Sequence, residues 1–198
     1  MQGMNIGVLS DIHADLEALT LALDRLQRIH RVDQILCAGD IVGRGAHHDE
    51  VVQLIRDRRI PTVRGNHDEW NYPLRADNKL FLRDLPLEWR GTFEGVNFYM
   101  THGKPGNNLW GLYRDHTSNT LLNMMLADLR ADVIITGHTH TPLYARVANG
   151  CVINPGSLYR FASPRSTSHS YGVFRLPERT FHVFDLNCPP DEQIRVQQ

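Results

Sequence analysis

Five short motifs that carry a carboxylate, an amide or a histidine each begin where an apolar run ends. The runs cover residues 5–9, 34–38, 61–63, 96–101 and 133–136, and each has the length and composition of a buried strand. Apolar residues spaced three and four apart from Leu16 to Ile29 predict a helix behind an N-cap at Asp15, and a second helix is expected over residues 49–59. This alternation of strands and helices predicts a parallel sheet with crossover helices.

The remainder of the chain is richer in strands. A short helix is expected over residues 80–84 and a longer one over residues 118–129, and Glu94-Gly95 is typical of a two-residue hairpin turn between two strands. Strand-like runs at residues 144–147, 152–154, 171–176 and 181–184 predict an antiparallel second half. We expect a single domain over residues 1–188, followed by a polar, mobile tail over residues 189–198.

Composition limits the classes of function. The net charge of -1 provides no overall attraction to nucleic acid or to an anionic membrane. We expect neither a spanning helix nor a signal peptide, because no apolar run is long enough and no charged-then-apolar leader is present. The three cysteines (Cys37, Cys151 and Cys188) are widely spaced and odd in number, which predicts reduced thiols in a cytoplasmic protein.

The motifs should meet at one surface. In parallel α/β sheets, ligands bind beyond the carboxyl ends of the strands. Residues i and i+2 of an extended segment share a face, so Asp11 with His13, and His138 with His140, can point at one centre. Asn66 and His67 are adjacent, which suggests that Asn66 serves the metal side and that another group, such as substrate, faces His67.

Oxygen and imidazole ligands without a thiolate suit Mn, Fe, Ni, Co or Zn. Seven candidate ligands are too many for one tetrahedral ion and suit two divalent metal ions, with Mn favoured. They are Asp11, His13, Asp40, Asn66, His102, His138 and His140. Two such ions form a clamp for in-line displacement at phosphorus.

The order of these motifs resembles that of the calcineurin-like metallophosphoesterase superfamily: Asp-x-His, Gly-Asp, Gly-Asn-His-Asp, His-Gly and Gly-His-Thr-His. Downstream, Asn154-Pro-Gly-Ser157, Pro164-Arg165 and Tyr171 are similar to the small stand-alone bacterial and archaeal phosphodiesterases of that superfamily. The resemblance implies an α/β fold, a four-layer α/β/β/α sandwich with two mixed β-sheets, and a dinuclear site between the sheets.

The resemblance also implies roles for individual residues. Asp40 would bridge two metals, one of them held with Asp11, His13 and His140, and the other with Asn66, His102 and His138. His67 would face the scissile phosphate as a catalytic residue, with Asp68 orienting its imidazole, and Gly156 and Ser157 would lie at the substrate mouth. Arg44 is a further substrate-binding candidate, although Gly43 stands where the related phosphoprotein phosphatases carry an aspartate.

These expectations lead to a phosphodiesterase in which a metal-bridging hydroxide attacks phosphorus in line. The alternatives are a phosphomonoesterase or nucleotide pyrophosphohydrolase with the same site, and a scaffold protein that binds partners on this fold. The expected partner is a small phosphoester substrate, with no specific nucleic-acid binding and no membrane, and a homo-oligomer stays open. For Trp110, core packing is favoured over a place in a pocket wall.

Overall fold

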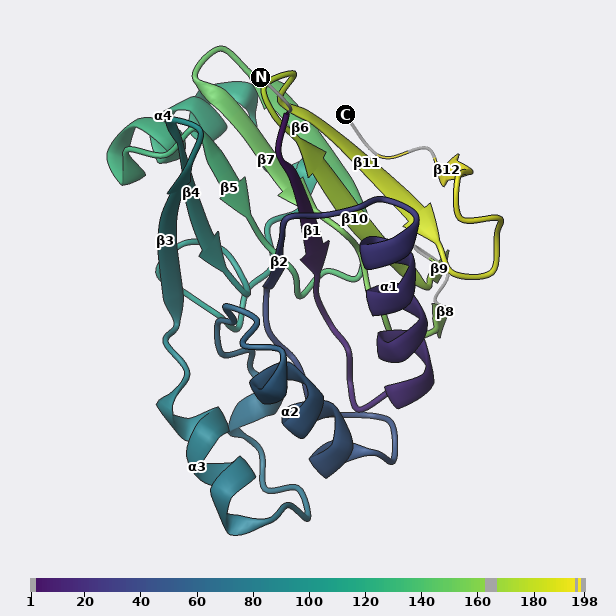
Figure 1. The fold of residues 1–198 in the computed structure, drawn as a ribbon. Coiled ribbons are helices and arrows are strands. Elements are labelled where there is room, and N and C mark those ends of the chain that lie inside the picture. Colours follow the sequence, from purple (N-terminus) through teal and green to yellow (C-terminus); the bar gives the residue numbers. More distant parts are fainter. Residues whose placement is uncertain (1–2, 163–166, 195, 197–198) are drawn as a thin grey trace.

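The protein is a two-sheet sandwich with helices on its outer faces (Figure 1). The computed structural model describes residues 3–162, 167–194 and 196. Two mixed five-stranded sheets face each other, as expected for the four-layer α/β/β/α arrangement. Among the helices of these residues, none has both the length and the apolar character needed to cross a bilayer.

The first sheet has the order β12-β11-β10-β1-β2. Its strands are β1 (Asn5–Leu9), β2 (Gln34–Cys37), β10 (Ser170–Arg175), β11 (Thr180–Asp185) and β12 (Gln193–Ile194). β1 pairs with β2 in parallel and with β10 antiparallel, which makes the sheet mixed. The third strand predicted at residues 61–63 is wrong as a strand, because Thr62 forms only an isolated parallel bridge with Cys37.

The expected mobile tail contains a paired segment. β12 lies within residues 189–198 and pairs with β11, so the first sheet extends beyond residue 188. The domain boundary at that residue stays a prediction. Pro164-Arg165 of the family resemblance lie outside the described residues.

The second sheet has the order β3-β4-β5-β7-β6. Its strands are β3 (Glu88–Phe93), β4 (Val96–Thr101), β5 (Val133–Ile135), β6 (Leu143–Val147) and β7 (Gly150–Asn154). Both turn residues between β3 and β4 have a positive φ, 48° at Glu94 and 77° at Gly95, which suits a tight hairpin. A small third sheet pairs β8 (Phe161–Ala162) with β9 (Thr167–Ser168).

The described residues form four α-helices: α1 (Leu16–Arg28), α2 (His48–Asp57), α3 (Ala76–Asp84) and α4 (Asn119–Leu129). The Asp15 carboxylate accepts a hydrogen bond from the Ala18 N–H at 3.0 Å, which confirms the predicted N-cap. The Ser118 hydroxyl caps α4 in the same way. α3 begins earlier than predicted, and two 3₁₀ turns, η1 (His67–Glu69) and η2 (Arg114–His116), were not predicted.

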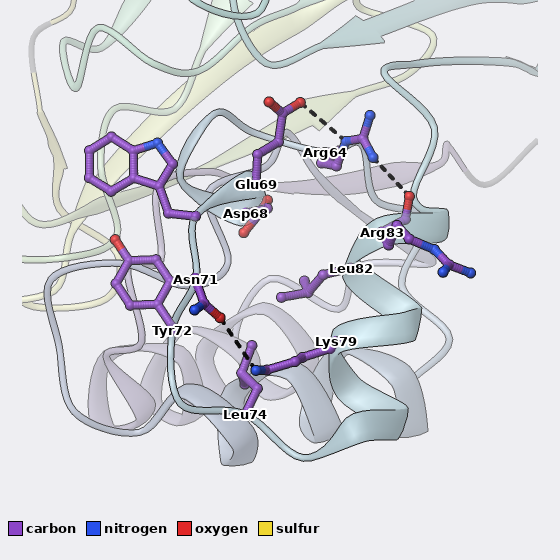
Figure 2. A pocket seen from close by; sticks show the side chains of 10 residues that line it. Arg64, Asp68, Glu69, Asn71, Tyr72, Leu74, Lys79, Leu82 and Arg83 are labelled. Atoms are coloured by element: carbon purple, nitrogen blue, oxygen red, sulfur yellow. Dashed lines mark hydrogen bonds and ion pairs between the residues drawn. The ribbon is translucent and has the colours of Figure 1, made fainter.

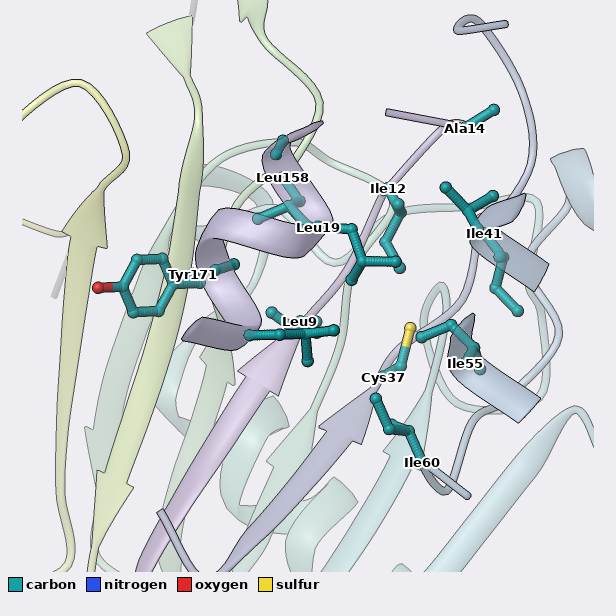
Figure 3. Close-up of a cluster of buried hydrophobic side chains, with 14 of the residues drawn as sticks. Leu9, Ile12, Ala14, Leu19, Cys37, Ile41, Ile55, Ile60, Leu158 and Tyr171 are labelled. Atoms are coloured by element: carbon teal, nitrogen blue, oxygen red, sulfur yellow. The ribbon is translucent and has the colours of Figure 1, made fainter. Parts of the chain in front are cut away.

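Three apolar clusters hold the layers together. In the first, Leu19 of α1 and Ile55 of α2 lie against Leu9 and Cys37 of the first sheet (Figure 3). The second fills the space between the sheets, and the third packs α4 against the second sheet. Burial raises the pKa of the Cys37 thiol to about 12, so this cysteine is an inert core residue, as expected.

His30, which follows α1, should make stability depend on pH. Its Nε2 lies 2.9 Å from the Tyr171 hydroxyl, and burial, with Arg175 and Arg25 nearby, lowers its pKa to about 4. The His30 side chain of the unfolded chain binds a proton near pH 6.5, whereas that of the folded protein binds one only near pH 4. The contribution of neutral, buried His30 to the free energy of unfolding is therefore complete above pH 6.5 and is lost as the pH falls toward 4.

We therefore expect acidification from about pH 7 to about pH 5 to lower the free energy of unfolding more in the natural protein than in a His30→Gln variant. Urea unfolding at both pH values measures the difference, and the other titrating groups are common to the two proteins. Equal losses in the two proteins would contradict the assignment to His30.

Candidate metal centre

The predicted motifs converge at the carboxyl ends of strands from both sheets. The segment after β1 provides Asp11 and His13, and the residues after β2 provide Asp40. In the second sheet, His102 follows β4, and His138 and His140 follow β5. Asn66 and His67 stand at the beginning of η1. Because β1 and β2, and likewise β4 and β5, are parallel pairs, their carboxyl ends lie at the same edge of each sheet.

One group of ligand atoms gathers around His13. His13 Nε2 lies 3.2 Å from His140 Nε2 and 3.9 Å from Asp11 Oδ1, and His140 Nε2 lies 3.0 Å from the same Asp11 oxygen. All three residues are buried. Two imidazole nitrogens and a carboxylate oxygen that face one another in a buried site are typical of a metal site.

A second group gathers around Asn66. Its side-chain oxygen lies 2.9 Å from His138 Nδ1 and 3.1 Å from His102 Nε2, and the two imidazole nitrogens are 3.3 Å apart. His138 and His140 therefore lie in different groups, His138 with Asn66 and His102, and His140 with His13 and Asp11.

Asp40 lies between the two groups. Its Oδ2 is 3.8 Å from His13 Nε2 and 3.4 Å from His102 Nε2, so one oxygen faces both. Its Oδ1 accepts a hydrogen bond from the His67 N–H at 2.8 Å, which fixes the orientation of the carboxylate. Gly65 allows this close approach, because a Cβ there would overlap the Asp40 side chain.

The buried carboxylates and imidazoles of the centre shift one another's pKa values. Burial opposes ionisation of Asp40, but His102 outweighs it and holds the pKa of that carboxyl below its usual range. For His102 the balance is reversed: burial lowers its pKa, but Asp40 raises it to about 9. Burial lowers the pKa of His13 to about 4, so its nitrogen is neutral at pH 7 and can act as a ligand.

Most of the candidate ligands have a left-handed backbone. The φ angles are 54° at Asp11, 49° at His13, 53° at Asp40, 64° at His138 and 55° at His140. Residues other than glycine rarely adopt this conformation, and each instance costs about 1–3 kcal/mol. Hydrogen bonds from the Asp11 N–H to Gly39 and from the His13 N–H to Asp40 help to hold it.

Comparison with known proteins agrees with this geometry. A family model described as the calcineurin-like phosphoesterase superfamily domain matches residues 4–178. The chain belongs to the calcineurin-like phosphoesterase superfamily. An uncharacterized protein of Methanocaldococcus jannaschii is 30% identical, over 78% of this chain and 70% of the relative.

Several solved structures have the same fold. A metallophosphoesterase from Sphaerobacter thermophilus is 26% identical with a TM-score of 0.69, covering 93% of this chain and 89% of that one. A structure described as a novel archaeal phosphodiesterase is 21% identical with a TM-score of 0.64, covering 91% and 99%. The zinc complex of Vps29 from Entamoeba histolytica is 23% identical with a TM-score of 0.63, covering 91% and 90%. The last two likenesses concern the fold alone.

His67 lies beside the group of ligand atoms around His13. Its ring makes an edge contact with His13 at a centroid distance of 4.8 Å, and Tyr72 contacts its Nδ1 through a hydroxyl 3.1 Å away. Burial lowers the pKa of His67, and the positive charge of Arg44 adds to the effect. One ring nitrogen of His67 lies within 4.8 Å of ligand atoms of His13 and Asp40, so distance alone does not exclude His67 as a ligand.

The predicted role of Asp68 requires a correction. Its two carboxylate oxygens accept hydrogen bonds from the backbone N–H groups of Val42 at 3.1 Å and Gly65 at 2.9 Å. Asp68 therefore ties two loops together, and the His67 imidazole is oriented by Tyr72 instead. Residues adjacent in sequence project in different directions from the η1 turn.

The three predicted substrate-binding residues, Arg44, Gly156 and Ser157, differ in exposure. Arg44 is exposed and close enough to His67 to influence its pKa. Gly156 and Ser157 are buried, and the Ser157 hydroxyl donates to the Asp11 carbonyl at 3.1 Å, so Ser157 supports the Asp11 loop from behind. A place for Gly156 and Ser157 at the substrate mouth stays a prediction.

Several neighbours of the site were not predicted. The Ser10 hydroxyl donates to Asp11 Oδ2 at 2.6 Å, and the Tyr159 ring lies 6.0 Å from that of His13. Trp70 contacts the His67 ring at a centroid distance of 4.2 Å. A signal for Ser10 was available in its position before Asp11, whereas the contacts of Trp70 and Tyr72 depend on the unpredicted η1 turn.

Proposed function

We propose that this phosphoesterase hydrolyses phosphodiesters with two divalent metal ions, Mn favoured, bound between its two sheets. The observation that carries the proposal is the position of Asp40, one oxygen of which faces both ligand groups. The proposed ligands of one ion are Asp11, His13, Asp40 and His140. Those of the other are Asp40, Asn66, His102 and His138.

The residues present fit such a pair of ions. The donor set combines carboxylate, amide and imidazole groups without a thiolate, which suits divalent transition metals. Buried clusters of three candidate ligands, Asp11 with His13 and His140, and Asp11 with Asp40 and His102, each lie within 4.8 Å of one another. Bound divalent ions supply Lewis acidity toward the phosphate and lower the pKa of coordinated water.

His67 is the proposed hydrogen-bond donor to the leaving oxygen. A Tyr72 hydroxyl that donates to Nδ1 leaves the proton of the neutral imidazole on Nε2, the nitrogen on the opposite side of the ring. The lowered pKa of His67 favours this neutral form. Nε2–H can then stabilise charge that develops on the leaving oxygen.

Tyr72→Phe should lower kcat about three- to tenfold, the effect of one neutral hydrogen bond, without changing metal content. Steady-state kinetics with elemental analysis measures both quantities. Tyr144→Phe is the matched control, because its hydroxyl also makes one hydrogen bond, to the Arg179 carbonyl at 2.7 Å, away from the ligand groups. A Tyr72→Phe enzyme with unchanged kcat would contradict the orienting role.

The proposed activity is tested by removing metal, restoring Mn²⁺ and comparing a chromogenic phosphodiester with the matching monoester. We expect a rate that depends on added metal and is larger on the diester. A monoester preference would support the phosphomonoesterase alternative, and release of pyrophosphate from a nucleoside triphosphate would support the pyrophosphohydrolase. Two bound ions with no hydrolysis of any of these would favour the scaffold alternative.

A further inference from the structure

Two tryptophans near the ligand groups are more exposed than their size predicts. Trp70 is 57% exposed and Trp110 is 66% exposed, so Trp110 does not pack in the core as the sequence suggested. Large exposed aromatic side chains are uncommon on soluble domains, and beside a binding site they often contact a ligand. Their positions relative to the candidate ligands indicate which kind of ligand.

Trp70 is held against the proposed catalytic histidine. Its backbone N–H donates to the His67 carbonyl at 3.1 Å, and its ring contacts the His67 ring at a centroid distance of 4.2 Å. The Tyr72 ring is nearly parallel to the indole, with a centroid distance of 6.5 Å. Both side chains also line a cavity of about 300 Å³ on the α3 side of the segment, where Tyr72 lies opposite Leu82 (Figure 2).

Trp110 belongs to a loop that runs between two candidate ligands. The loop begins after His102 and returns at Gly111, where a Cβ would crowd the His138 ring. A hydrogen bond from the Lys104 N–H to the Trp110 carbonyl, 2.7 Å long, closes the loop. Lys104 Nζ lies 5.9 Å from the indole centroid, a cation–π arrangement that places a positive charge beside the ring.

Glu69 links this loop to the one that carries Trp70. It pairs with Arg64 at 3.4 Å (Figure 2) and accepts a hydrogen bond from the Asn108 amide at 3.3 Å. The two exposed indoles therefore stand on connected loops: Trp70 contacts His67, and Trp110 precedes Gly111, whose backbone lies close to the His138 ring. A group attached to a phosphate between these histidines would extend toward the indoles.

We propose that Trp70 and Trp110 form a stacking subsite for a planar aromatic group of the substrate, and that the enzyme prefers phosphodiesters that carry a nucleoside. The inference rests on the phosphoesterase activity proposed above. Flat, exposed rings suit a nucleobase because stacking needs no matching hydrogen bonds, and the positive charges of Lys104 and Arg44 suit an anionic ester.

The test keeps the leaving group constant and changes the retained group. The substrates are the p-nitrophenyl esters of thymidine monophosphate, phenyl phosphate and methyl phosphate. We expect the natural enzyme to have the highest kcat/KM on the thymidine ester. Trp70→Ala and Trp110→Ala should each lower that value about 5- to 150-fold, the effect of losing one stacked base, and lower the value on the methyl ester by a smaller factor, because that ester has no base to stack.

Trp70→Phe should retain most of the thymidine preference, because it keeps an aromatic face. Leu109→Ala is the control, since Leu109 is 63% exposed on the same loop and has no aromatic ring. If kcat/KM of the natural enzyme exceeded the methyl ester value by the same factor on the phenyl and thymidine esters, the aromatic subsite would stand and the nucleoside preference would be overturned. Equal losses on all three esters would overturn the subsite, because the indoles would then only support the loops.

A binding measurement separates this inference from the proposed activity. We expect thymidine monophosphate to quench tryptophan fluorescence of the natural protein, and to quench it less in each Trp→Ala variant. Quenching without hydrolysis of any ester would support the subsite and count against the phosphoesterase proposal. Hydrolysis without quenching and without a thymidine preference would overturn the subsite alone.

Discussion

Asp40→Asn should lose both metal ions together with activity. The Oδ2 position faces His13 at 3.8 Å and His102 at 3.4 Å, so a neutral amide there removes a negative charge from both proposed ligand groups. Because a metal ion provides several kcal/mol of transition-state stabilisation, we expect kcat to fall on the order of a thousandfold or more. Elemental analysis after equilibration with Mn²⁺, alongside steady-state kinetics, measures both effects.

Asparagine preserves the shape of the side chain and an oxygen for the His67 N–H, so the variant should fold. Asp24→Asn is a suitable control, because it removes one carboxylate charge from an exposed pair with Arg28 on α1. Two fully occupied metal sites in Asp40→Asn would refute the bridge. Loss of one ion alone would assign Asp40 to a single group.

His67→Ala should lower kcat by about two to three orders of magnitude, the effect of removing one donor that stabilises charge developing in the transition state. Metal content should stay near that of the natural protein, because the proposed ligand sets do not need His67. The measurement separates two readings of the same geometry, since a His67 ring nitrogen also lies within 4.8 Å of ligand atoms of His13 and Asp40.

His182→Ala provides the matched control for this variant. His182 lies on β11, and its ring contacts Gln193 and Thr180, far in the chain from every candidate ligand group. An inactive His67→Ala protein that had also lost its metal would identify His67 as a ligand and overturn its role as a hydrogen-bond donor to the leaving oxygen.

The sequence predicted most of the elements but not how they pair. The local apolar pattern predicted β1 and α1 well. β1 is a short run of buried residues, and α1 buries apolar residues spaced three and four apart, so each can be recognised from its own segment of sequence. The antiparallel pairing of β1 with β10 joins residues far apart in the chain, and no local pattern encodes it. Residues 61–63 have the composition of a strand, yet they form only an isolated bridge, in which the Pro61 carbonyl accepts from the Cys37 N–H and the Val63 N–H donates to the Cys37 carbonyl.

At the candidate site, too, the sequence predicted some features and not others. The motifs predicted which residues gather, because each follows a strand that ends at a shared edge. They did not predict what each neighbour does: Asp68 bonds to two backbone N–H groups, and Tyr72, five residues after His67, takes its place on the imidazole. Contacts of this kind depend on how the η1 turn directs its side chains, and the apolar pattern carries no information about such turns.

The left-handed backbone at five candidate ligands sets stability against function in this chain. At these positions glycine, and to a lesser degree asparagine, would adopt the same conformation with less strain. A screen that rewarded only heat resistance would therefore be drawn toward substitutions that remove Asp11, His13 or Asp40. To stabilise such an enzyme without inactivating it, the loops that carry the candidate ligands should be left unchanged, and stabilising substitutions should be sought in the helices and outer strands.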